Sequence, residues 1–115
     1  MSKINCYLRT HRRQWGLSQK ELSFLLGLRD RSHVSRLELT TDKPPVKVAL
    51  GCEILFGFPA KAIFPKLYAN IEDSLMRRAF VLHQRLKRED SKLARTKTAL
   101  LEDALRRAKE SHPQL

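Results

Sequence analysis

The fold of this chain is decided by residues 16–38, which read GLSQKELSFLLGLRDRSHVSRLE. Apolar side chains recur there at helical spacing in two clusters, namely Leu22, Leu25 and Leu26, and then Val34 and Leu37. Residues three or four apart share one face of a helix. The stretch therefore predicts two short helices that bury these faces and are joined by a tight turn after the first cluster.

The flanks of both predicted helices carry residues that begin and end helices. Ser18 is a preferred N-cap, and Glu21 three residues later completes a capping box. Glycine accepts the left-handed conformation that a helix exit requires, so Gly27 is expected to end the first helix. Asp30 or Ser32 can cap the second helix. The expected local structure is a helix, a turn and a second helix.

The pattern Gly-Leu-Ser-Gln-x-Glu-Leu-x-x-Leu-Leu-Gly-Leu, followed by Val-Ser-Arg-Leu-Glu, resembles the Xre-like helix-turn-helix family. This is the phage repressor and Cro type of DNA-binding domain. The resemblance covers about residues 8–65, and it implies an all-α, five-helix lambda-repressor-like domain, which we assign to residues 1–67. Val34 lies one residue later than the commonest family spacing, which predicts a longer turn around residues 29–31. In the family, the second helix lies in the DNA major groove.

The resemblance also implies which residues contact double-stranded DNA. The second helix, at about residues 31–39, supplies the base-reading side chains, and arginine can bridge guanine O6 and N7. Polar and basic groups near the start of the first helix of the motif add to backbone N–H groups that favour phosphate. The predicted DNA-binding residues are Gln19, Lys20, Arg31, Ser32, His33, Ser35, Arg36 and Lys43.

Residues 4–15 predict a helix that precedes the motif, with Leu8 and Trp15 in the core. In the resembled family, the position of Arg12 often pairs with the glutamate that ends the recognition helix, here Glu38. A partly buried guanidinium needs a carboxylate, and a two-point pair would fix this first helix against the recognition helix. The alternative for this arginine is a solvated surface position.

The rest of the motif-bearing half predicts two more helices. Residues 40–45 form a polar linker, and a strongly apolar central packing helix begins at Pro45 or just after it and reaches Phe56. Residues 60–64 predict a final short helix that Pro65 stops. The aromatic residues of this region that we expect in the core are Phe56, Phe58 and Phe64.

The charge balance favours a polyanionic partner. The chain has 115 residues, a formal net charge of +11 and a pI near 10.3. Residues 1–67 hold 12 Lys and Arg against 5 Asp and Glu, whereas residues 68–115 hold 11 against 7. The basic excess is therefore larger in the half that carries the motif. A ribosome-associated or merely soluble basic protein is the alternative that charge alone leaves open.

Several classes of protein are not expected from this composition. Cys6 and Cys52 are isolated and are expected to be reduced thiols. The histidines have no metal-ligand spacing, so neither a metal nor a cofactor is expected. No apolar run approaches the roughly 18 residues of a membrane span, which predicts a protein that is neither secreted nor membrane-spanning. Together with the DNA binding that the family resemblance implies, the expected location is cytoplasmic and nucleoid-associated. We also expect no enzyme, because no nucleophile with a base, carboxylate pair or phosphate loop is found.

Residues 68–115 predict a helical extension rich in Ala, Leu, Arg, Lys and Glu. One apolar stripe contains Leu75, Ala79, Leu82, Leu86, Leu93 and Leu100, but Glu89, Thr96 and Asp103 interrupt its partner positions. Two helices, at about residues 71–87 and 91–109 with a hinge at residues 88–90, are therefore favoured over one long zipper. Either arrangement leaves an apolar stripe that must be covered by a partner, which is either the N-terminal domain or a second subunit.

The functional hypothesis is a sequence-specific DNA-binding transcriptional regulator that represses by occupying its operator as a homodimer. A dimer is expected because one recognition helix reads too few base pairs for useful specificity. The alternative is an antitoxin-like interaction module whose residues 70–110 bind a partner protein, with DNA binding for autoregulation. A tail that folds only on its partner would favour this alternative, and a helical, dimeric tail would favour the regulator.

Overall fold

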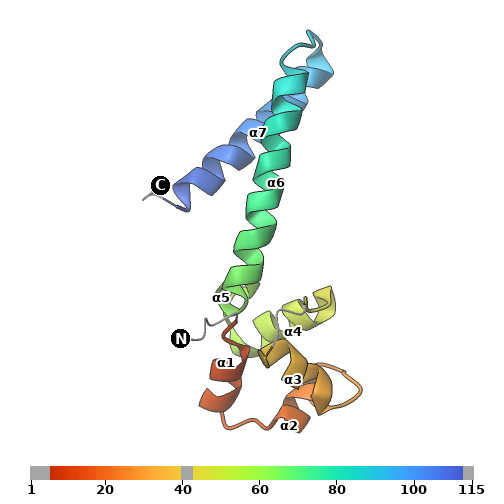
Figure 1. The fold of residues 1–115 in the computed structure, drawn as a ribbon, viewed down its shortest axis with the longest axis vertical. Helices are drawn as coiled ribbons and strands as arrows, with labels where there is room; N and C mark the ends of the chain where they lie inside the picture. The colour runs from red at the N-terminus through yellow and green to blue at the C-terminus, as the bar shows by residue number, and fades with distance from the viewer. Residues whose placement is uncertain (1–5, 40–42, 113–115) are drawn as a thin grey trace. The chain divides into compact units, whose positions relative to one another are not determined.

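The computed structural model describes residues 6–39 and 43–112, and every regular element in these ranges is an α-helix (Figure 1). The chain divides into two compact units, Met1–Ala69 and Asn70–Leu115. The predicted all-α class is confirmed for the described residues. The helices are α1 (Leu8–Gln14), α2 (Gln19–Leu25), α3 (Arg31–Leu39), α4 (Val46–Phe56), α5 (Ala60–Ile63), α6 (Pro65–Leu86) and α7 (Lys92–Glu110).

The two helices of residues 16–38 are α2 and α3, and their predicted boundary signals are confirmed. The Ser18 hydroxyl accepts the N–H of Glu21 at 3.0 Å, and the Glu21 carboxylate accepts the N–H of Ser18 at 2.9 Å. Gly27 has a φ of 70°, in the left-handed region. Five residues, 26–30, connect the two helices. The capping box thus begins α2, and glycine allows the chain to turn toward α3.

The core of the first unit takes side chains from all of its first five helices. Each of α1 to α5 contributes at least one side chain with no exposed surface. The Tyr7 N–H also donates to the Ile63 carbonyl at 2.7 Å, which joins the start of α1 to the end of α5. The fully buried side chains are Leu8, Leu22, Val34, Val48, Cys52 and Ile63. The motif helices are therefore part of one packed body.

The predictions that three residues are buried are wrong. Trp15 is 67% exposed because it lies in the turn after α1 and not on the helix. Leu25 is 52% exposed because α2 has only two turns, and its buried side is taken by Leu22 and Leu26. Phe58 is 48% exposed in the loop between α4 and α5. Helical periodicity does not apply to Trp15 and Phe58, which lie outside the helices.

The predicted central packing helix, α4, is buried on one face only. Val48, Cys52 and Phe56 recur every four residues and lie in the core. The Phe56 ring also stacks on the imidazole of His11, with centroids 5.5 Å apart. Because apolar residues lie all around this helix, its sequence did not indicate which face is buried. The apolar residues of α4 that remain exposed are Val46, Leu50, Ile54 and Leu55.

Two predicted helix boundaries are wrong. Pro65 begins α6 and does not act as a stop, so this helix starts six residues before the predicted residue 71. Proline suits the first position of a helix because the N–H that it lacks has no partner there. Near the N-terminus, α1 begins at Leu8 instead of residue 4. Residues 1–5 and residues 40–42 of the predicted linker lie outside the described ranges.

The predicted pair of helices in the C-terminal half is confirmed, with residues 87–91 between α6 and α7. The Ser91 hydroxyl accepts the N–H of Ala94 at 3.1 Å and caps α7. His83 Nε2 of α6 lies 2.8 Å from Glu102 Oε2 of α7. His112, just after the end of α7, has its Nε2 2.7 Å from Oε1 of Glu72 in α6.

The apolar stripe predicted for this half is only partly buried. Among the described residues of the second unit, the buried ones are Ala79, Leu86 and Ala94, whereas the exposed members of the stripe are Leu75, Leu82, Leu93 and Leu100. Within the described ranges, no helix is both long and apolar enough to cross a membrane.

The left-handed turn at Gly27 generates a stability prediction. An added Cβ would meet no atom within 4 Å, so Gly27→Ala should lower the free energy of unfolding only through its positive φ, by about 1–2 kcal/mol. Gly27→Asn is the matched control, and it should lose less because asparagine tolerates this conformation. Chemical denaturation measures both variants. An alanine variant as stable as the parent would contradict the role given to this turn.

Candidate nucleic-acid interface

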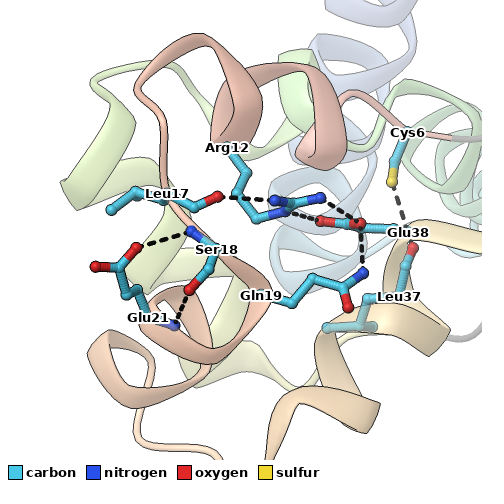
Figure 2. A network of polar contacts seen from close by, with 8 residues as sticks. All are labelled: Cys6, Arg12, Leu17, Ser18, Gln19, Glu21, Leu37 and Glu38. Atoms are coloured by element: carbon cyan, nitrogen blue, oxygen red, sulfur yellow. Dashed lines mark hydrogen bonds and ion pairs between the residues drawn. The ribbon is translucent and has the colours of Figure 1, made fainter.

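A buried ion pair fixes α1 against α3, and Figure 2 shows it at the centre of a polar network. Arg12 Nε donates to Glu38 Oε2 at 2.6 Å, and Arg12 Nη2 donates to Glu38 Oε1 at 3.2 Å. The Arg12 side chain is 11% exposed and the Glu38 side chain only 1%. The third guanidinium nitrogen, Nη1, donates to the Leu17 carbonyl at 2.7 Å. Arg12 is therefore not the solvated surface residue that the sequence left open.

Gln19 joins the same network from the first position of α2. Its Nε2 donates to Glu38 Oε1 at 3.1 Å (Figure 2). One carboxylate therefore accepts hydrogen bonds from α1 and α2 while it belongs to α3. The predicted phosphate role of Gln19 is a separate matter, but its amide also has this structural function, which the sequence reasoning missed. No local signal in the sequence pointed to it, because Gln19 and Glu38 are nineteen residues apart.

The recognition helix predicted from the sequence, α3, has one buried and one exposed side. Val34 and Leu37 are buried in the core of the first unit. Arg31, Ser32 and Arg36 are exposed, and this side of the helix therefore carries two guanidinium groups. The remaining two predicted residues, His33 and Ser35, are half-buried.

Asp30 caps α3 and accepts hydrogen bonds from both the backbone and the side chain of Ser32. The Ser32 N–H donates to Asp30 Oδ1 at 2.9 Å, and the Ser32 hydroxyl donates to the same oxygen. These hydrogen bonds, the hydroxyl first, hold the pKa of the Asp30 carboxyl below its usual value of 3.8. In this arrangement the hydroxyl proton is directed at the carboxylate, and the lone pairs of the hydroxyl oxygen stay available as acceptors.

The His33 side chain lies near the same capping residue, Asp30. Its Nδ1 lies 3.7 Å from Asp30 Oδ1, which is too long for a hydrogen bond. This nitrogen is enclosed and has no hydrogen-bond partner among the described residues. A base contact by His33 would therefore have to come from the rest of its ring.

The remaining predicted DNA-binding residues are two lysines outside α3. Lys20 is exposed in the first turn of α2, and Lys43 is exposed in the coil before α4. Residues 40–42, which separate α3 from Lys43, are not among the described residues. An additional exposed cation, Arg29, lies in the turn before α3, and the sequence reasoning gave it no role. Its position directly before the cap of α3 was the signal that could have found it.

The thiols of the first unit have the character of core residues. Burial raises the pKa of the Cys52 thiol to about 12 and also raises the pKa of the Cys6 thiol. Cys6 Sγ donates to the Leu37 carbonyl at 3.4 Å. Thiols with raised pKa values are poor nucleophiles near neutral pH. Among the described residues, no group of three His, Cys, Asp or Glu side chains could hold a metal ion.

No protein-family model matches the chain, and no match was found among curated proteins or solved structures.

The buried ion pair predicts a large difference between two arginine substitutions. Arg12→Ala should lower the free energy of unfolding by about 3–5 kcal/mol, because it leaves the Glu38 carboxylate buried with only the Gln19 amide. Arg107→Ala is the matched control, since its ion pair with Asp103 is exposed, and it should cost less than about 1 kcal/mol. Urea denaturation of both variants measures the difference. Equal losses would contradict the structural role of the buried pair.

Proposed function

We propose that the protein is a sequence-specific, double-stranded-DNA-binding transcriptional regulator of the Xre-like helix-turn-helix type. In this proposal the first unit is a five-helix lambda-repressor-like domain. The exposed side of α3, with Arg31 and Arg36 opposite the buried Val34 and Leu37, is the observation that carries the proposal. An α-helix fits the major groove of B-DNA, and the basic excess of residues 1–67 favours the same partner.

In the proposed complex, α3 lies in the major groove and reads bases. Arg31 and Arg36 each can donate two parallel hydrogen bonds to guanine O6 and N7. Ser32, whose proton is held by Asp30, accepts from an amino group of cytosine or adenine. His33 and the half-buried Ser35 add weaker polar contacts at the same edge.

Contacts to the DNA backbone come from residues around α3. Gln19 and Lys20 lie in the first turn of α2, where free backbone N–H groups favour phosphate. Lys43 supplies a further charge before α4. Such contacts position the protein on the duplex without reading its sequence.

We propose that the regulator acts as a homodimer and represses by occupying its operator. A single α3 contacts too few base pairs for useful specificity, and two copies on adjacent half-sites double the number of base contacts. The α6–α7 pair supports dimerisation because apolar residues on both helices are exposed, among them Leu75 and Leu100. DNA as the partner implies a cytoplasmic, nucleoid-associated protein with a binding role and no catalytic one.

A second candidate function is an antitoxin-like module in which residues 70–110 bind a partner protein. The same exposed apolar residues of α6 and α7 favour it. DNA binding by the first unit would then serve autoregulation. The two candidates share the DNA-binding surface and differ in the partner of the second unit.

Base reading by α3 predicts the effect of removing its two arginines. Arg31→Ala and Arg36→Ala should each weaken binding to the specific site by roughly 1–3 kcal/mol, with little loss for random DNA, and leave the fold intact. Arg88→Ala removes an equal charge between α6 and α7 and is the control for net charge. Fluorescence anisotropy with both duplexes measures the losses. Normal specific binding by both α3 variants would refute the assigned recognition residues.

Dimerisation through the second unit predicts the behaviour of a shortened chain. Truncation after Tyr68 should yield a folded monomer, because the residues of the first core lie before this point. Its affinity for the operator should fall because one half-site is lost. Sedimentation equilibrium and circular dichroism measure assembly and folding. A truncated chain that still dimerises would move the interface into the first unit.

A further inference from the structure

One side of α6 combines arginines with exposed apolar side chains along an open groove. The spacing of the lining residues, alternately three and one, places them on a single helix face. The groove has a volume of about 610 Å³. It is lined by Ser74, Arg77, Arg78, Val81, Leu82 and Arg85. The positions that α6 buries in the second unit, Ala79 and Leu86, are not among them.

The centre of this face is apolar. Val81 is 49% exposed and Leu82 is 43% exposed, so both side chains keep much of their surface in contact with water. Covering such surface favours binding because it removes apolar area from water. The groove therefore favours a partner that brings apolar side chains to its middle.

The two ends of the apolar centre are cationic. Arg78 lies one turn before Val81–Leu82, and Arg85 lies one turn after them. In the described part of the chain, neither arginine has a hydrogen bond or an ion pair, whereas Arg77 pairs with Asp73. The guanidinium groups of two residues whose backbone positions lie about 10 Å apart along the helix axis are thus available for carboxylates of a partner.

We propose that this face of α6, which we call the Arg78–Arg85 face, binds an acidic amphipathic helix of a partner protein. Leucine-sized side chains of the partner lie on Val81 and Leu82. Carboxylates one turn to either side of them pair with Arg78 and Arg85. This binding does not depend on DNA binding by the first unit, because all the residues involved lie in the second unit, and it rests on the second candidate function, for which it names the chemistry of the partner.

Charge and size argue against the other occupants. A second copy of the same face would bring its own arginines against Arg78 or Arg85, and like charges across an interface oppose association. A nucleic-acid backbone would pair with the arginines but leave Val81 and Leu82 without an apolar partner. A single phosphate-sized anion fills little of a 610 Å³ groove. An acidic helix with an apolar centre satisfies both kinds of side chain.

Three synthetic helical peptides test the proposal with the full-length protein. The first carries leucines at the centre and glutamates one turn before and after them. The second replaces the leucines with serine, and the third replaces the glutamates with lysine. Isothermal titration measures affinity, and NMR chemical-shift changes locate the site. The first peptide should bind at least about tenfold more tightly than the other two, with the largest shifts in residues 74–85.

Charge reversal identifies the residues responsible. Arg78→Glu/Arg85→Glu should weaken binding of the glutamate peptide by at least about tenfold and should allow the lysine peptide to bind. Lys92→Glu/Lys97→Glu is the matched control, since it reverses two exposed charges on α7, and it should change affinity less than about twofold. Circular dichroism checks that both variants keep their helix content.

Other results would overturn the proposal and identify another occupant. Equal binding of the leucine and serine peptides, or equal losses in the two double variants, would reduce the interaction to general attraction between opposite charges. A changed sedimentation mass of Arg78→Glu/Arg85→Glu would assign the face to a second copy of the chain. Arg78→Glu/Arg85→Glu could also lose more duplex-DNA affinity than Lys92→Glu/Lys97→Glu while it still binds the glutamate peptide normally. That result would assign the Arg78–Arg85 face to nucleic acid.

Discussion

The arrangement of the motif depends on one buried carboxylate, that of Glu38. It accepts two hydrogen bonds from Arg12 and one from Gln19, so α1, α2 and α3 meet at a single group that is 1% exposed (Figure 2). Removing Arg12 would leave the carboxylate charge in a site almost closed to water, which makes other packings of these helices costly. The orientation of α3, and with it the exposure of Arg31 and Arg36, follows from this constraint.

The features that could be predicted from the sequence are those in which local chemistry determines the backbone. The Ser18–Glu21 capping box and the left-handed Gly27 are decided within a few residues, and both were predicted correctly. The limits of α3 followed from the same kind of signal, since Asp30 caps it and its buried residues recur at helical spacing. The two-helix form of the C-terminal half followed from the polar break before Ser91.

The errors arose where burial depends on contacts between distant segments. Trp15 and Phe58 were expected in the core from their apolar character, yet they lie outside helices and remain partly exposed. Pro65 is compatible with both the end of one helix and the start of the next, and only the three-dimensional structure selects the second. The bond between Gln19 and Glu38 spans nineteen residues of sequence, so local spacing gave no account of it. The DNA-contacting roles of the α3 side chains stay predictions.

The most direct test of the central claim is DNA binding by the full-length protein at two salt concentrations. The two probes are a duplex recovered by repeated selection from a random pool and a scrambled duplex of the same composition. Specific recognition through α3 predicts a preference of about 10³ or more for the selected duplex that persists at the higher salt concentration. Equal affinities that fall together as salt rises would contradict it, because the net charge of +11 alone would then explain the binding.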